Sequence, residues 1–188
     1  MPVLGGGMMD FQATLYLVTG LRFALPFMSD EAEGDRAKLM DRLREEFPSV
    51  SIVPANYEDS VDLKQVATPK LMLVGHSFGG DRCIEWIGNA PDRRVDSLFL
   101  LDPVPDDSHV SERHSADFRF EIPVNVVSAT CYRRSQGFWW PFSKSINANR
   151  AGLIEYLVDE GHGAFYRNEA VVAGIRASLA GLISLASV

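Results

Sequence analysis

The sequence has only two cysteines, and neither belongs to a spacing that a metal site or a disulfide framework would need. Cys83 falls in a predicted helix and Cys131 at the end of a predicted strand, so we expect two reduced, partly buried thiols. No metal ion and no organic cofactor is expected. Reduced thiols fit a cytoplasmic protein, and this is the localisation that we expect.

Long apolar runs and positive charge are also scarce. No run approaches the roughly 18 apolar residues of a membrane span, and the first residues lack the charged-then-apolar layout of a signal peptide. Acidic residues outnumber basic ones by 25 to 18, which gives a formal net charge of −7. Because no basic stripe is present to neutralise phosphates, nucleic acid is not expected as a partner.

The length of 188 residues predicts one domain, which can bury a core but is small for an α/β enzyme. Hydrophobic residues make up 46% of the chain, and this fraction argues against disorder. Residues 1–10 contain three consecutive glycines and are predicted to form a flexible leader, which leaves residues 11–188 as the domain. A cap or lid domain must be short or absent. The sequence does not indicate an oligomeric state.

Apolar runs of strand length alternate with helical patterns along the chain. The predicted strands are Ala13–Val18, Val50–Val53, Leu71–Val74, Val95–Leu101, Ile122–Ala129 and Ile154–Val158. About four or five helices are expected, including one from Ser29 to Pro48 and one from Asn168 to Leu185. Mostly uninterrupted apolar strands between helices predict a largely parallel sheet in a three-layer α/β/α fold.

The most informative stretch lies between the third predicted strand and the helix that follows it. Ser77 stands at the apex of a sharp turn, with Gly75 two residues before it and Gly79 two residues after it. So tight a reversal needs residues without bulky side chains at both flanking positions. The alternative interpretation is a glycine-rich turn that holds an incidental serine.

The Gly-x-Ser-x-Gly spacing, with a strand before it and a helix after it, resembles the nucleophile elbow of the α/β-hydrolase family. This resemblance covers nearly the whole chain after the leader and implies an α/β-hydrolase core without the family's first antiparallel strand pair. It also implies an oxyanion hole made by the backbone N–H groups of Phe78 and Leu21. The family commonly has His-Gly after the first strand of this core, whereas this chain has Thr19-Gly20.

A nucleophilic serine needs a base, and the sequence offers four histidines. His76 lies within the turn and is expected to point away from Ser77, while His109 and His114 lie in a polar segment typical of a surface loop. His162 follows the last predicted strand, where parallel sheets gather their catalytic groups. The resemblance places the base histidine there, so His162 is the predicted base.

The acid is less clearly marked. The family most often draws it from the loop after the penultimate strand, but the corresponding residues 128–134 contain no carboxylate. Asp102 ends the preceding strand, and its Leu-Asp-Pro-Val context is similar to that of plant chlorophyllases. The order Ser77, Asp102, His162 also agrees with the family order. Asp106, Asp107 and Asp159 remain alternatives, the first two in an expected exposed loop.

These residues together predict a serine hydrolase that cleaves a small-molecule carboxylic ester or thioester through an acyl-enzyme. A cofactor-free haloperoxidase or acyltransferase of the same fold, and a non-catalytic binding protein, are the alternatives. Phe23, Trp139 and Trp140 lie in apolar loop clusters at the predicted catalytic end and could line a substrate pocket or anchor the loops. Arg133 and Arg134, near the same end, could meet an acidic substrate or simply be solvated.

Overall fold

A computed structural model describes residues 10–20, 26–106, 115–135, 142–147 and 152–184, except for the side chains of residues 26–32. The expected leader, residues 1–10, lies outside this range apart from Asp10.

Six strands form one sheet in the order β2-β1-β3-β4-β6-β8, and every neighbouring pair is parallel. The six strands expected from the apolar runs are therefore confirmed, as is the parallel sheet. Their bounds are β1 (Ala13–Thr19), β2 (Val50–Asn56), β3 (Lys70–His76), β4 (Val95–Leu101), β6 (Val126–Arg134) and β8 (Leu153–Val158).

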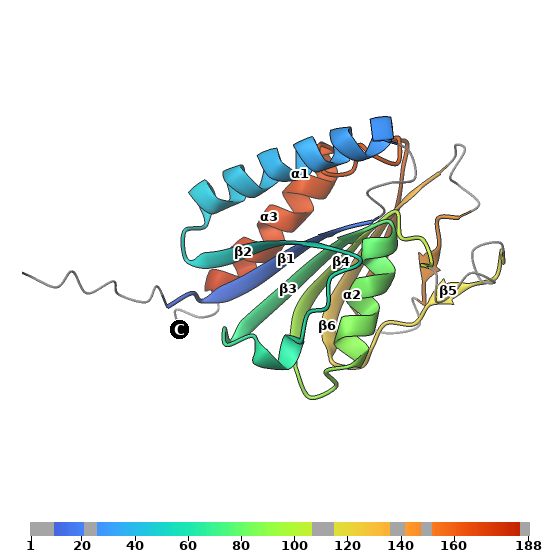
Figure 1. Cartoon of the computed structure of the whole chain (residues 1–188). Helices are drawn as coiled ribbons and strands as arrows, with labels where there is room; N and C mark the ends of the chain where they lie inside the picture. Colours follow the sequence, from blue (N-terminus) through green and yellow to red (C-terminus); the bar gives the residue numbers. More distant parts are fainter. Residues whose placement is uncertain (1–9, 21–25, 107–114, 136–141, 148–151, 185–188) are drawn as a thin grey trace, which may run out of the picture.

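Helices cover both faces of this sheet, as the expected three-layer α/β/α class requires (Figure 1). Helices α1 (Pro26–Glu46) and α3 (Glu169–Ser184) pack on one face, where Leu43 and Ile175 are completely buried. Helix α2 (Phe78–Gly88) packs on the other face. Both cysteines are free and buried on the α2 side, as expected. The sheet therefore separates two apolar cores, and burial of their side chains is the main favourable term in folding.

The described residues contain three α-helices and one short 3-10 helix, η1 (Leu63–Gln65), where the sequence predicted about four or five helices. The bounds of one predicted strand were wrong. The strand expected at 122–129 runs instead from Val126 to Arg134, because Pro123 lacks an N–H and accepts a turn hydrogen bond from Val126. Residues 130–134 thus belong to a strand, and Arg134 is its last residue.

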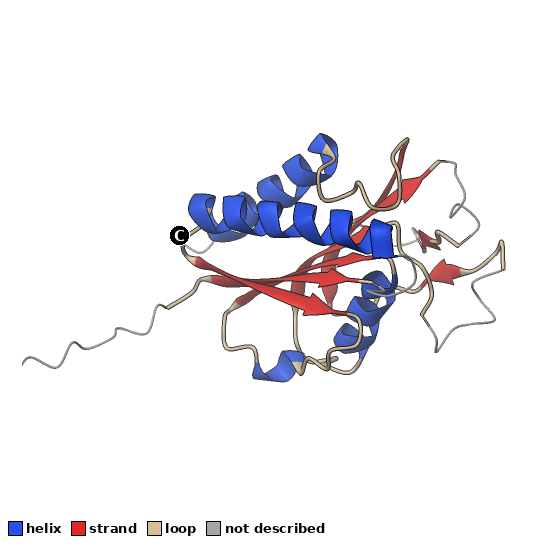
Figure 2. Cartoon of the chain, turned by 45° about the horizontal axis from the view of Figure 1, so that its top comes forward, coloured by secondary structure: helices blue, strands red, loops and turns tan. Residues whose placement is uncertain are grey.

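The carboxyl ends of the strands meet at one edge of the sheet. Register pairs Thr19 with Asn56, Leu101 with Tyr132, and Arg134 with Val158. A separate two-stranded parallel sheet, β5 (Arg119–Phe120) with β7 (Ser145–Ile146), lies on the α2 side (Figure 2). Residues that leave the ends of different strands are therefore neighbours, as expected for an α/β site. No helix in the described part of the chain has the length and apolar character needed to cross a membrane.

Candidate active site

The turn between β3 and α2 is strained and tightly packed. Ser77 has φ 57° and ψ −128°, a conformation that non-glycine residues rarely adopt. A Cβ on Gly75 would overlap the backbone of Gly79, and a Cβ on Gly79 would lie 2.5 Å from the Val18 carbonyl oxygen. Both glycines are therefore required by backbone contacts, as the sequence predicted. This strained turn places Ser77 directly after β3, at the edge of the sheet.

Gly20 borders the space beside the Ser77 side chain. A Cβ added to Gly20 would lie 2.7 Å from Ser77 Cβ and 3.0 Å from both Ser77 Oγ and the Phe78 nitrogen. The backbone of residue 20 thus packs directly against Ser77 and the first residue of α2, and only glycine fits there without a shift. An oxyanion hole needs a backbone N–H beside the nucleophilic hydroxyl, and the Phe78 N–H lies in such a place. The sequence had marked Gly20 only as part of the replaced His-Gly pair.

Asp102 and His162 lie in direct contact, although 60 residues separate them in the chain. His162 Nδ1 lies 2.5 Å from Asp102 Oδ2, the carboxylate is completely buried, and the imidazole is partly exposed. Asp102 follows β4 with φ 47°, a left-handed conformation that aspartate tolerates, and its N–H donates to the Tyr132 carbonyl. The structure therefore brings together the predicted acid and the predicted base.

Arg134 is a third member of this contact that the sequence did not identify. Its side chain is buried, and its Nε donates to Asp102 Oδ2 at 2.5 Å. Burial tends to raise the pKa of Asp102, but the hydrogen bond and charge of His162 and the charge of Arg134 outweigh it and lower that pKa to about 2. Asp102 is therefore an anion near neutral pH. Of the two possibilities that the sequence left open for Arg134, solvation is excluded, because β6 carries the residue into the buried edge of the sheet.

His76 supports His162 from the other side. Its Nε2–H donates to the His162 carbonyl at 2.6 Å, and the two ring centroids are 4.6 Å apart. Burial, followed by the neighbouring His162, lowers the pKa of His76 to about 3, so His76 is neutral and keeps this donor. His76 thus fixes the backbone of the segment that presents His162.

Buried polar contacts hold the residue that replaces the family's histidine. Thr19 Oγ1 lies 2.9 Å from Asn56 Oδ1 and 3.1 Å from Glu33 Oε1. The buried guanidinium of Arg36 donates to Thr19 Oγ1 and to the Ala55 carbonyl. These contacts tie the ends of β1 and β2 to α1, and they position the segment that leads into Gly20.

Several predicted residues cannot be placed. The oxyanion residue Leu21, the pocket residues Phe23, Trp139 and Trp140, the alternative acid Asp107, and His109 and His114 lie outside the described residues. Of the other alternative acids, Asp159 is exposed at the end of β8. Asp106 is buried, and its N–H donates to Asp81, so its expected exposure was wrong.

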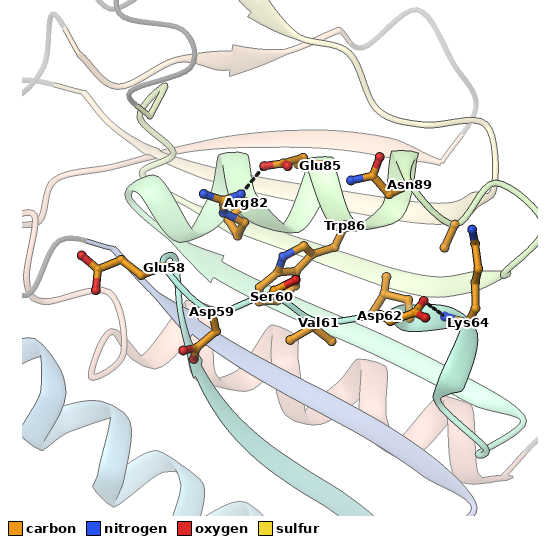
Figure 3. Close-up of a pocket in the computed structure, with 12 residues that line it drawn as sticks. Glu58, Asp59, Ser60, Val61, Asp62, Lys64, Arg82, Glu85, Trp86 and Asn89 are labelled. Carbon is orange, nitrogen blue, oxygen red and sulfur yellow. Dashed lines mark hydrogen bonds and ion pairs between the residues drawn. The ribbon is translucent and has the colours of Figure 1, made fainter.

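A polar cavity of about 330 Å³ lies beside α2, and Figure 3 shows its lining. Residues of the β2–η1 connection, including Asp59 and Asp62, form one wall, and Arg82 and Trp86 of α2 form the other. None of Ser77, Asp102 and His162 is among its lining residues. The carboxylates of Asp59 and Asp62 accept hydrogen bonds from nearby N–H groups of their own segment. This cavity is therefore separate from the site at the strand ends.

Comparison with known proteins gives matches of structure only. No protein-family profile matches the sequence. No curated protein matches it either. The fold is similar to that of Est1E from Butyrivibrio proteoclasticus, with a TM-score of 0.56 and 11% identity over 93% of this chain and 90% of that one.

Two further solved structures agree. The esterase domain of a Rhodothermus marinus protein has a TM-score of 0.53 and 12% identity, over 92% of this chain and 88% of that one. A lipase-esterase related protein from Clostridium acetobutylicum has a TM-score of 0.50 and 12% identity, over 91% of this chain and 96% of that one. With its strand order and its turn at Ser77, the chain has the α/β-hydrolase fold in a form with six parallel strands.

Proposed function

We propose that this protein is a serine hydrolase that cleaves carboxylic esters or thioesters through an acyl-enzyme on Ser77. The observation that carries the proposal is the contact between the buried, ionised Asp102 and His162 at the sheet edge where Ser77 stands. An Asp-His pair of this kind is what activates a serine hydroxyl as a nucleophile. The close approach of the Gly20 backbone to Ser77 and to the Phe78 nitrogen supports the same function.

The proposed mechanism uses the charge of Asp102. Since the anionic carboxylate accepts the proton on His162 Nδ1, the other ring nitrogen, Nε2, is left unprotonated and can act as a base. Nε2 takes the Ser77 proton as the hydroxyl attacks the carbonyl carbon, and Asp102 stabilises the imidazolium that forms. His162 then returns the proton to the leaving group, and water resolves the acyl-enzyme by the reverse roles.

The oxyanion of the tetrahedral intermediate is proposed to lie between the N–H groups of Phe78 and Leu21. The Phe78 nitrogen begins α2, so its N–H lies at the positive end of a helix dipole. Such a fixed donor stabilises charge that develops only in the transition state. Phe23, Trp139 and Trp140 remain the proposed apolar lining of the substrate pocket.

Esters are the first substrate class to test, because two of the similar structures are named as an esterase domain and a lipase-esterase related protein. The proposal is tested by labelling with a fluorophosphonate probe, which reacts with activated serines. Wild type should be labelled and should hydrolyse p-nitrophenyl acetate, and Ser77→Ala and His162→Ala should do neither. Ser184→Ala, which changes an exposed serine of α3, is the matched control and should behave as wild type.

The outcomes separate the remaining alternatives. If folded wild type is neither labelled nor active, the catalytic proposal is wrong and a binding protein of this fold is the better hypothesis. If Ser77 is labelled but water does not resolve the acyl-enzyme, an acceptor alcohol or thiol should release it, which would indicate an acyltransferase. If Ser77→Ala is still labelled, the nucleophile is another serine.

A further inference from the structure

We propose that Arg134 is a positioning residue of this site, which fixes the Asp102 carboxylate toward His162 and, through its charge, sets the pH range in which His162 can act as a base. The kinetic consequences rest on the proposed function. The contacts themselves do not, because they join three side chains from the ends of β4, β6 and β8.

Two donors share one oxygen of the acid. Arg134 Nε and His162 Nδ1 each lie 2.5 Å from Asp102 Oδ2, so the two nitrogens are at most about 5 Å apart. The backbone N–H of Arg134 adds a longer contact of 3.4 Å to the other oxygen, Oδ1. The planar guanidinium and this N–H together restrict rotation of the carboxylate. Arg134 therefore orients the same oxygen that His162 Nδ1 contacts.

A gain in folding stability does not explain why residue 134 is an arginine. A buried ion pair often contributes no more to stability than apolar residues of similar volume would. Here one guanidinium nitrogen, Nη2, is buried without a hydrogen-bond partner among the described residues, which adds a cost. Arg133 on the same strand shows the ordinary alternative, since it pairs with Glu155 at a partly exposed site.

The charge of Arg134 opposes protonation of His162. Among the described residues, Asp102 from β4 and the neutral His76 from β3 contact His162, and the cation Arg134 from β6 binds the same Asp102 oxygen. The fixed positive charge of Arg134 lies within about 5 Å of His162 Nδ1, and two positive charges at that separation repel each other. Removing that charge should therefore move the acid limb of kcat/KM to higher pH.

Three substitutions separate donor, charge and packing. In Arg134→Gln, the side-chain nitrogen stands the same number of bonds from Cα as Arg Nε, so a donor remains without charge. Arg134→Lys keeps the charge without the planar donor, and Arg134→Met keeps only the apolar stem. Arg133→Gln is the matched control, because it removes an equal charge from the neighbouring residue, which contacts Glu155 rather than Asp102.

The test has one readout that needs no activity. The His162 ring resonance, assigned by its loss in His162→Gln, is titrated by NMR, and its midpoint should rise by about one pH unit in Arg134→Gln and Arg134→Met. It should stay near the wild-type midpoint in Arg134→Lys and in Arg133→Gln. Thermal melts by circular dichroism identify any variant that does not fold, and Arg134→Gln, which retains a donor, is the variant most able to fold.

Hydrolysis of p-nitrophenyl acetate gives the second readout. The acid limb of kcat/KM should move with the NMR midpoint in Arg134→Gln, and Arg134→Met should also lose about 10-fold or more in kcat with little change in KM. An unchanged NMR midpoint in folded Arg134→Gln would overturn the proposal. If wild type is inactive but the midpoint rises, the proposed function fails while the role of Arg134 in setting His162 protonation stands.

Discussion

Replacing Gly20 by alanine tests whether catalysis depends on the close approach of the Gly20 backbone to Ser77. The added Cβ would lie 2.7 Å from Ser77 Cβ, whereas non-bonded carbons prefer about 3.5–4.0 Å, so one side must move by roughly 1 Å. Ser77 is held by its N–H to the Leu101 carbonyl and by its carbonyl, which accepts from Gly80 and Val104. The segment at Gly20 is therefore the part that should shift, away from the Phe78 N–H.

The size of the effect follows from this displacement. Misplacing a catalytic group by 1 Å costs about 100-fold in rate, and losing one oxyanion donor costs about 100- to 1,000-fold. We expect Gly20→Ala to lower kcat for p-nitrophenyl acetate by at least about 100-fold, with KM little changed. Fluorophosphonate labelling of Ser77 should slow in parallel.

A matched glycine provides the control. Gly34 is an exposed residue of α1, and a Cβ added there meets nothing within 4 Å. Gly34→Ala should keep wild-type activity and should stabilise the helix by up to about 1 kcal/mol. A wild-type kcat in folded Gly20→Ala would refute the reasoning. It would mean that neither the proposed nucleophile nor the proposed oxyanion donor depends on the contact with residue 20.

Three further changes follow from the same contacts. Asp102→Asn should lower kcat by roughly 10⁴-fold, because a neutral amide cannot hold His162 in the tautomer that acts as a base. Asp159→Asn, at the exposed end of β8, should change kcat little. Equal kcat values for the two variants would show that Asp102 is not the acid. Burial and the adjacent His162 lower the pKa of His76 to about 3. As the pH falls below about 6.5, His76 therefore takes up a proton only in the unfolded chain, and the free energy of unfolding decreases. Urea unfolding should show wild type losing about 2 kcal/mol more than His76→Gln between pH 7 and pH 5, and equal losses would contradict that burial. Gly75→Ala should prevent folding, since its Cβ would overlap the Gly79 backbone, and a wild-type melt would show that the turn can relax.

The sequence predicted those parts of the fold and site that depend on short stretches of chain. The turn at Ser77 needs only its two glycines and the flanking strand and helix, all within residues 70–88. Asp102 and His162 could be selected because each follows an apolar strand, and the ends of parallel strands meet at one edge. The contact between them then follows from the strand order.

The parts that were missed depend on pairing between distant segments. The apolar run suggested that the fifth strand ends near residue 129, but its pairing with Glu155, Tyr156 and Val158 of β8 continues the ladder to Arg134. The side chain of Arg134 thereby reaches Asp102, and no local pattern marks an arginine for burial beside an acid. The contact of His76 with His162 spans 86 residues, so it too required the fold.

Ser77 and Asp102 follow neighbouring strands of the sheet, and this determines how the two residues are held. Asp102 leaves the strand next to the one that carries Ser77, and the Ser77 N–H donates to Leu101, the residue before the acid. Ser77 is thus joined to the residues on both sides of Asp102, because its carbonyl also accepts from the Val104 N–H, and the Tyr132 carbonyl of β6 accepts the N–H of Asp102. His162 is the member on a loop, and it must reach across the end of β6 to meet Asp102.

This arrangement explains why β6 ends in a residue that contacts the acid. Arg134 occupies the end of β6, between β4, which leads to Asp102, and β8, which leads to His162. An apolar residue there would leave one side of the buried carboxylate without a donor, which is costly for an anion. Arg134 supplies that donor, while His76 and Asp102 hold the backbone and the ring of His162. An apolar substitution at position 134 should therefore disturb Asp102 before it disturbs the sheet.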